Sequence, residues 1–149
     1  MEFLIHLFNN YKTKKMKVNR IIIALISGLL IMGFTIKMQD RKPWPVPDAA
    51  KNKKNAVANN TESIAAGKIL WGTHCKSCHG TKGLGDGTKA AQLKTEPGDF
   101  SKADVQAQTD GALFYKLSEG RDDMPSFKKK IADEEDRWDL VCYIRTLKK

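Results

Sequence analysis

The segment Cys75-Lys76-Ser77-Cys78-His79 constrains this chain more than any other part of its sequence. Its two thiols are three positions apart on one helical turn, so each can add to one of the two vinyl groups along a haem edge. The imidazole of His79 follows directly as a ligand for the iron, and this CxxCH spacing is the pattern of c-type haem attachment. The sequence therefore predicts one covalent haem c, bound through thioethers at Cys75 and Cys78.

Other uses of closely spaced cysteines fit the chain less well. A structural zinc site takes four ligands, usually from paired motifs, and only His74 and the distant Cys142 remain to complete one. A thioredoxin-like CxxC follows a strand, whereas the segment before Cys75 has helical character. Three cysteines are also too few for a disulfide scaffold. We expect Cys142 to be a small buried hydrophobe, with a redox-active or dimer-forming thiol as the alternative.

The second axial ligand of the iron is sought among the remaining histidines and methionines. His74 adjoins Cys75 on the proximal side, where it cannot easily reach the opposite face of a haem. Met124 is the one methionine of residues 61–149, and it follows an expected helix end at Gly120. We expect His79 and Met124 to be the axial ligands, a pair that raises the reduction potential relative to two histidines. A methionine that fills a gap in the core or lies on the surface is the alternative.

An uncharged apolar run over residues 21–36 follows a basic segment and indicates a transmembrane helix. At helical rise it spans about 24 Å, slightly less than a hydrocarbon core, and the basic flank orients the N-terminus to the cytoplasm. No A-x-A-like cleavage site follows directly. We therefore expect a retained signal-anchor that places the domain in the periplasm, with cleavage to a soluble periplasmic form as the alternative. Residues 1–20 form the basic N-terminal region, and Met16 is an alternative start.

The stretch 37–60, rich in Pro, Lys and Asn, is expected to be a flexible tether with an extended Pro-rich part.

Residues 1–60 hold 11 of the 26 basic residues and 3 of the 17 acidic ones, a balance of +8. Residues 61–149 are left with +1, so the domain lacks the basic face that a nucleic-acid partner requires. For Trp44 three interpretations stay open: the membrane interface, a contact with the domain, or a plain linker residue.

Residues 61–149 have the pattern of an all-α domain. Three helices are expected, from Thr61 to about Cys75, Asp110 to Glu119 and Asp133 to about Leu147. Thr61 is the expected N-cap of the first helix, and Gly120 is the expected end of the second. Residues 80–108 are expected to be mostly loop. Loops this long in roughly 90 residues indicate that a large group fills the middle of the domain.

Several residues beyond the motif follow a known pattern: Gly67, Trp71, Leu140, Tyr143, the glycine-rich loop 80–87 and the Gly120-Arg121-x-x-Met124-Pro125 segment. With these residues the chain from Thr61 onward resembles the class I cytochrome c family. The resemblance implies the cytochrome c fold, in which three main helices and long loops surround one covalent haem, here preceded by a transmembrane helix. It also assigns to the Pro97 carbonyl a hydrogen bond from the proximal imidazole, which orients that ring.

The implied function is electron transfer by one His/Met-ligated haem on the outer face of the cytoplasmic membrane. We expect redox proteins as partners, and neither catalytic residues nor a small-molecule substrate. One alternative is a haem subunit of a membrane oxidoreductase or terminal oxidase complex. Another is a gas sensor or peroxidase with an open iron site, against which Met124 argues. The lysines of residues 128–130 either steer an acidic partner or, because Asp122 and Asp123 lie close by, form a solvated run.

Overall fold

The structure, a computed structural model, describes residues 11–12 and 43–149. The predicted transmembrane helix, residues 21–36, lies outside the described residues, as do most of residues 1–20 and residues 37–42 of the expected tether. In the described part of the chain no helix is long and apolar enough to cross a membrane. The chain divides into two units, of which the second, Trp44–Lys149, contains the expected domain.

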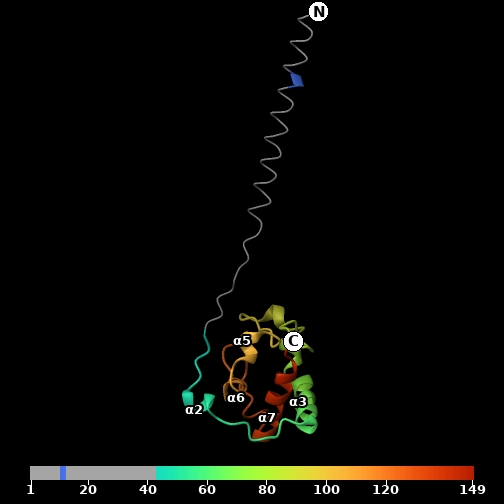
Figure 1. Cartoon of the computed structure of the whole chain (residues 1–149). Helices are drawn as coiled ribbons and strands as arrows, with labels where there is room; N and C mark the ends of the chain where they lie inside the picture. Colours follow the sequence, from blue (N-terminus) through green and yellow to red (C-terminus); the bar gives the residue numbers. More distant parts are fainter. Residues whose placement is uncertain (1–10, 13–42) are drawn as a thin grey trace, which may run out of the picture. The chain divides into compact units, whose positions relative to one another are not determined.

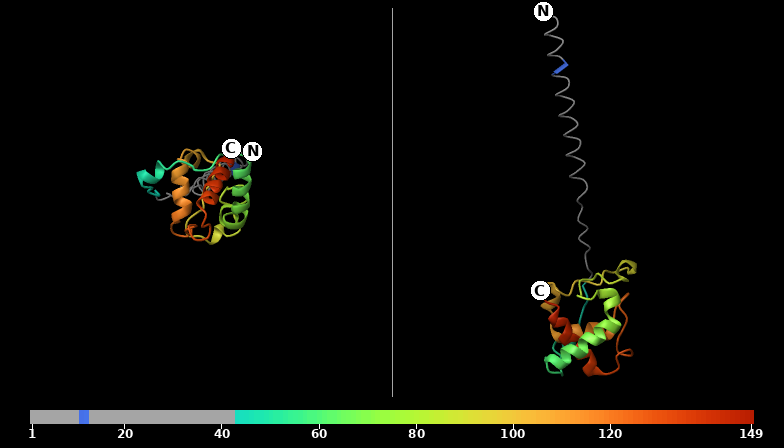
Figure 2. Two further views of the ribbon diagram at one scale, coloured as in Figure 1. Left: turned by 90° about the horizontal axis from the view of Figure 1, so that it is seen from below. Right: turned by 90° about the vertical axis from the view of Figure 1, so that its right-hand side faces the viewer.

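Helices joined by loops make up this second unit (Figures 1 and 2). Its helices are α2 (Asp48–Lys51), α3 (Thr61–His74), α4 (Lys76–His79), α5 (Ala103–Gln106), α6 (Asp110–Glu119) and α7 (Glu134–Thr146), with a 3-10 turn at Ala90–Gln92. Residues 43–149 contain no strand, and one isolated β-bridge joins Arg121 to Met124. The longest helices, α3, α6 and α7, lie where three helices were predicted. The mostly helical fold is therefore confirmed.

Side-chain caps determine where the three long helices begin. Thr109 caps α6 and Asp133 caps α7, each through a side-chain oxygen that accepts a backbone N–H of the first turn. The predicted cap of α3, Thr61, is wrong by one position. Asn60 caps this helix instead, and its side chain accepts the N–H of Ser63 at 2.9 Å. Asparagine and threonine are both good N-cap residues, so the sequence does not distinguish Asn60 from Thr61. The backbone conformation decides which of the two caps the helix.

The crossing of α3 and α7, which lie side by side in Figures 1 and 2, brings two predicted positions into contact. A Cβ on Gly67 would lie 2.0 Å from the carbonyl oxygen of Asp139 and 2.9 Å from Cβ of Tyr143. Trp71, one turn after Gly67, is 3% exposed, and its ring centroid lies 5.7 Å from that of Tyr143. The two helices therefore approach closely at Gly67, where no Cβ holds them apart.

A second part of the core lies between α6 and α7. The rings of Phe114 and Trp138 stack there, with centroids 3.9 Å apart and planes 19° from parallel. Cys142 of α7 is 1% exposed, which confirms the predicted buried position. Burial of large apolar side chains such as these contributes about 1.5–3 kcal/mol each, so α7 is held on two sides, by α3 and by α6.

Residues 44–60, assigned from the sequence to a flexible tether, pack against α6 and α7 instead. We call this segment the strap; Figure 1 shows it in teal and green, running through α2 to the start of α3. Val46 of the strap is 9% exposed, and Gly111 of α6 lies so close that a Cβ would be 2.2 Å from the Ala50 carbonyl oxygen. Three polar contacts hold the strap against the helices. They join Thr109 Oγ1 to the Lys51 carbonyl (2.8 Å), Lys53 Nζ to Glu134 (2.6 Å) and Asn55 Nδ2 to Cys142 Sγ (3.4 Å).

Candidate functional site

The CxxCH motif forms one helical turn directly after α3. The N–H of Cys75 donates to the Trp71 carbonyl at 3.0 Å, and the Cys75 carbonyl accepts the N–H of His79 at 3.0 Å. Cys75 therefore ends α3 and begins α4. Cys75 and Cys78 are free, half-buried thiols. The turn thus brings the two predicted thioether positions and the predicted proximal ligand together, as their spacing indicated.

Aromatic rings surround the imidazole of His79. Its centroid lies 4.9 Å from that of Phe100, edge to face, and 5.7 Å from that of Trp71. Trp71 is fixed in turn, because its Nε1–H donates to the Gly80 carbonyl at 3.0 Å. Burial lowers the pKa of His79 to about 4, and the Pro97 carbonyl partly offsets this effect. The ring is therefore neutral at neutral pH, which is the form that binds a metal.

One nitrogen of this imidazole, Nδ1 of His79, is buried and has no hydrogen-bond partner among the described residues. The Pro97 carbonyl is near enough to act on the pKa of the ring, but its contact falls short of hydrogen-bond geometry. The hydrogen bond from His79 to Pro97 therefore stays a prediction. Orphaned buried polar atoms are rare in folded proteins. This one fits a ring that takes its final orientation when its other nitrogen binds iron.

Cys75 fits a thioether better than a charged ligand. Burial, and secondly the neighbouring Cys78, raises the pKa of the Cys75 thiol to about 12. A thiolate, the form that binds zinc and reacts in redox motifs, is thus disfavoured here, whereas a thioether carries no charge that burial could penalise. The described part of the chain contains no group of three or more His, Cys, Asp or Glu side chains placed to hold a metal ion.

Met124 lies in a tight loop between α6 and the buried Phe127. We call residues 120–126 the Met124 loop. Gly120 ends α6 with φ of 70°, as predicted for the helix stop. Arg121 and Met124 then pair through two backbone hydrogen bonds, of 2.8 and 2.9 Å. The Met124 side chain is half-buried and packs against the hydrophobic core.

A carboxylate connects the Met124 loop to the segment that leads to Pro97. Asp123 accepts the backbone N–H groups of Lys94 and Thr95 at 2.7 and 3.1 Å. The chain segment that carries Pro97 and the loop that carries Met124 are thereby held together. Sequence analysis missed this role of Asp123, because no local pattern around an exposed aspartate identifies partners so far away in the chain.

The remaining candidates from the sequence lie near Phe127. The ring centroid of His74 lies 6.1 Å from that of Phe127, edge to face. Lys128 pairs with Glu119, and Lys130 Nζ lies 5.8 Å from the Phe127 ring. All three lysines of residues 128–130 are exposed, as both the solvated run and the steering of a partner require.

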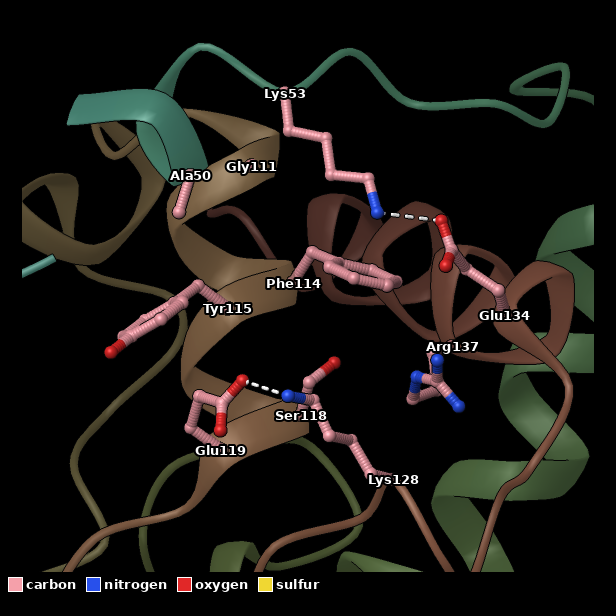
Figure 3. A pocket seen from close by; sticks show the side chains of 10 residues that line it. All are labelled: Ala50, Lys53, Gly111, Phe114, Tyr115, Ser118, Glu119, Lys128, Glu134 and Arg137. Atoms are coloured by element: carbon pink, nitrogen blue, oxygen red, sulfur yellow. Dashed lines mark hydrogen bonds and ion pairs between the residues drawn. The ribbon is translucent and has the colours of Figure 1, made fainter. Parts of the chain in front are cut away.

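A cavity of about 310 Å³ lies between the strap, α6 and α7 (Figure 3). Its lining contains none of the predicted site residues; it consists of Ala50, Lys53, Gly111, Phe114, Tyr115, Ser118, Glu119, Lys128, Glu134 and Arg137. Two ion pairs border it, one between Lys53 and Glu134 and the other between Lys128 and Glu119 (Figure 3). Most of its charges are thus matched within the chain, and the cavity is separate from the CxxCH turn.

Comparison with known proteins decides the family. Residues 64–148, more than half of the chain, match the family model described as cytochrome c. The chain belongs to the cytochrome c family. Membership implies a covalently bound haem c and haem-based electron transfer. The residues present fit that group, because one helical turn carries the neutral imidazole of His79 together with the thiols of Cys75 and Cys78.

Two solved structures are similar to this cytochrome c chain. One is the reducing HAO-like protein complex Kustc0457/Kustc0458 of Kuenenia stuttgartiensis, with a TM-score of 0.56 and 24% identity, covering 74% of this chain and 53% of that chain. The present chain thus spans about half the length of that relative, and the likeness concerns the fold. The other is the KustC0563 c-type cytochrome, with a TM-score of 0.47 and 30% identity, covering 56% of this chain and 98% of that chain. No curated protein matches the sequence.

Proposed function

We propose that this chain is an electron carrier with a single haem c, bound covalently by Cys75 and Cys78 and ligated axially by His79 and Met124. The observation that carries the proposal is the helical turn that places both thiols beside a neutral, buried imidazole. The haem supplies an iron that changes between the ferric and ferrous states.

The chain's own residues keep the ligands of this iron constant. Trp71 and Phe100 pack around the imidazole of His79 and limit the access of water to it. The Asp123 carboxylate fixes the Met124 loop to the segment before Pro97. A site whose ligands stay the same in both oxidation states rearranges little when an electron arrives or leaves, which suits a carrier and disfavours an open iron site for gas or peroxide.

We further propose that residues 21–36 anchor the chain in the cytoplasmic membrane, with the haem domain on its outer face. The basic residues before this apolar run support that orientation. Attachment of haem c takes place outside the cytoplasm, in agreement with the same orientation. Redox proteins are then the partners of the domain. Its acidic and basic residues nearly balance, so no strong net charge selects one kind of partner.

Optical spectra of the purified holoprotein test the proposed ligands. Met124→Ala should abolish the ferric charge-transfer band of a methionine–iron bond and allow the ferrous form to bind carbon monoxide. His74→Ala is the matched control, because His74 is the other imidazole near the motif, and its spectrum should equal that of the unsubstituted protein. An unchanged spectrum in Met124→Ala, or a lost band in His74→Ala, would contradict the assignment.

A further inference from the structure

The strap reaches the Met124 loop through one aromatic side chain, Trp44. The guanidinium carbon of Arg121 lies 4.5 Å from the centroid of the Trp44 ring. Lys116 of α6 approaches the same ring, with Nζ 5.6 Å from its centroid. Both distances lie within the range of cation–π contacts, for which tryptophan is the best partner. Of the three interpretations of Trp44, the structure thus shows a contact with the domain.

The Trp44 ring contacts two positively charged side chains, Arg121 and Lys116, at the same time. Burial, and secondly Arg121, lowers the pKa of Lys116, which shows that the two cations act on each other. The negative face of an indole ring favours both cations in its neighbourhood. If the ring were lost, the mutual repulsion of Arg121 and Lys116 would lose this compensation. The Arg121 side chain would lose one of its anchors and keep its ion pair with Asp122, at 3.4 Å.

The backbone of Arg121 is part of what holds Met124 in place. Its N–H donates to the Met124 carbonyl and its carbonyl accepts the Met124 N–H. The residues on either side, Gly120 and Asp122, have φ of 70° and 53°. A left-handed conformation at a residue other than glycine persists only where the surroundings fix it. Anchoring the Arg121 side chain therefore restricts the loop that carries the Met124 sulfur.

We propose that Trp44 is a positioning residue for Met124. Its contact with Arg121 stabilises the conformation of the Met124 loop in which the methionine sulfur can bind the iron. The inference rests on the proposed ligation by Met124. It gives the strap a role in the haem site, although Trp44 lies outside residues 64–148, the range that the family model matches.

Two substitutions of Trp44 in the full-length holoprotein form a matched pair. Trp44→Leu keeps an apolar side chain without a ring, and Trp44→Phe keeps an aromatic face. The measurement is the Kd of imidazole for the ferric form, since imidazole must displace Met124, together with the intensity of the charge-transfer band. We expect Trp44→Leu to bind imidazole about threefold to tenfold more tightly, the change that loss of one cation–π contact produces. Trp44→Phe should stay within about twofold of the unsubstituted protein.

A second control and a double-mutant cycle separate this role from a general loosening of the strap. Lys53→Ala removes the strap contact with Glu134 and should lower the Tm without a change in the Kd of imidazole. Arg121→Ala should tighten imidazole binding, and adding Trp44→Leu to it should change the Kd by less than about twofold, because the shared contact is already gone.

Three results would overturn the proposal: equal Kd values in Trp44→Leu and Trp44→Phe, additive effects of Trp44→Leu and Arg121→Ala, or an equal effect of Lys53→Ala. Met124→Ala serves as the reference for an open site and should bind imidazole most tightly. If its Kd and spectrum equal those of the unsubstituted protein, Met124 is not the ligand, and the proposed ligation fails together with this inference. The two failures are therefore distinguishable.

Discussion

Two glycines of α3, Gly67 and Gly72, have opposite surroundings. A Cβ at Gly67 would collide with the backbone carbonyl of Asp139, whereas a Cβ at Gly72 would meet nothing within 4 Å. Backbone cannot move aside as the end of a flexible side chain can, so the collision at Gly67 would force α3 away from α7. Cys75 follows at the end of α3. The position of the CxxCH turn therefore depends on the lack of a Cβ at Gly67.

Gly67→Ala should therefore destabilise the holoprotein by at least about 2 kcal/mol, as expected for overpacking against backbone. Gly72→Ala is the matched control on the same helix, and it should leave the free energy of unfolding unchanged or raise it by up to about 1 kcal/mol, because alanine favours a helix. Chemical denaturation followed by circular dichroism measures both values. Equal stabilities of the two variants would contradict the close crossing of α3 and α7.

At the scale of elements, sequence analysis located α3, α6 and α7 because their signals are local: apolar spacing, a capping residue and a glycine stop. The CxxCH turn was predictable for the same reason, since its ligands are contiguous. The strap was not, because it has no apolar period and its partners, such as Thr109 and Glu134, lie far along the chain. The role of Asp123 was missed in the same way, and the sequence left three interpretations of Trp44 open, because the contacts of both residues are long-range and no short pattern encodes them.

The packing of the strap on α6 makes a specific prediction for Gly111. A Cβ there would lie 2.2 Å from the Ala50 carbonyl oxygen and 2.7 Å from that of Lys53, so Gly111→Ala should push the strap away from α6. Loss of about 1–2 kcal/mol of local stability would raise the rate of tryptic cleavage at the strap lysines about tenfold. Limited proteolysis with mass spectrometry measures the rate at each lysine.

The control for this experiment is again Gly72→Ala, because a Cβ there would meet nothing within 4 Å, and this variant should leave the cleavage rate unchanged. If Gly111→Ala were cleaved no faster than the unsubstituted protein, the strap would not depend on the close approach at Gly111. Faster cleavage within α6 or α7, rather than within the strap, would indicate general unfolding and would also contradict the prediction.

At the scale of the whole molecule, the strap changes the length of the link to the proposed membrane anchor. The sequence assigned residues 37–60 to a tether, but residues 44–60 belong to the folded unit. Residues 37–43 then remain as the link to the apolar run 21–36, and seven residues span at most about 25 Å when fully extended. An anchored domain would therefore meet its redox partners close to the membrane surface. Residues 1–60 carry +8 of the net charge of +9.

Cell fractionation tests this arrangement. The full-length chain should stay in the membrane fraction after washing at high salt and high pH, because a retained hydrophobic anchor does not depend on charge. A haem-stained band of full length and a His/Met optical spectrum should appear in that fraction. A control chain in which a cleavable signal peptide replaces residues 1–36 should give the same spectrum in the soluble periplasmic fraction, because the folded unit begins at Trp44. If the full-length chain instead yields soluble haem protein with a new N-terminus after residue 36, the leader is cleaved and the anchor is refuted, while the haem site stands.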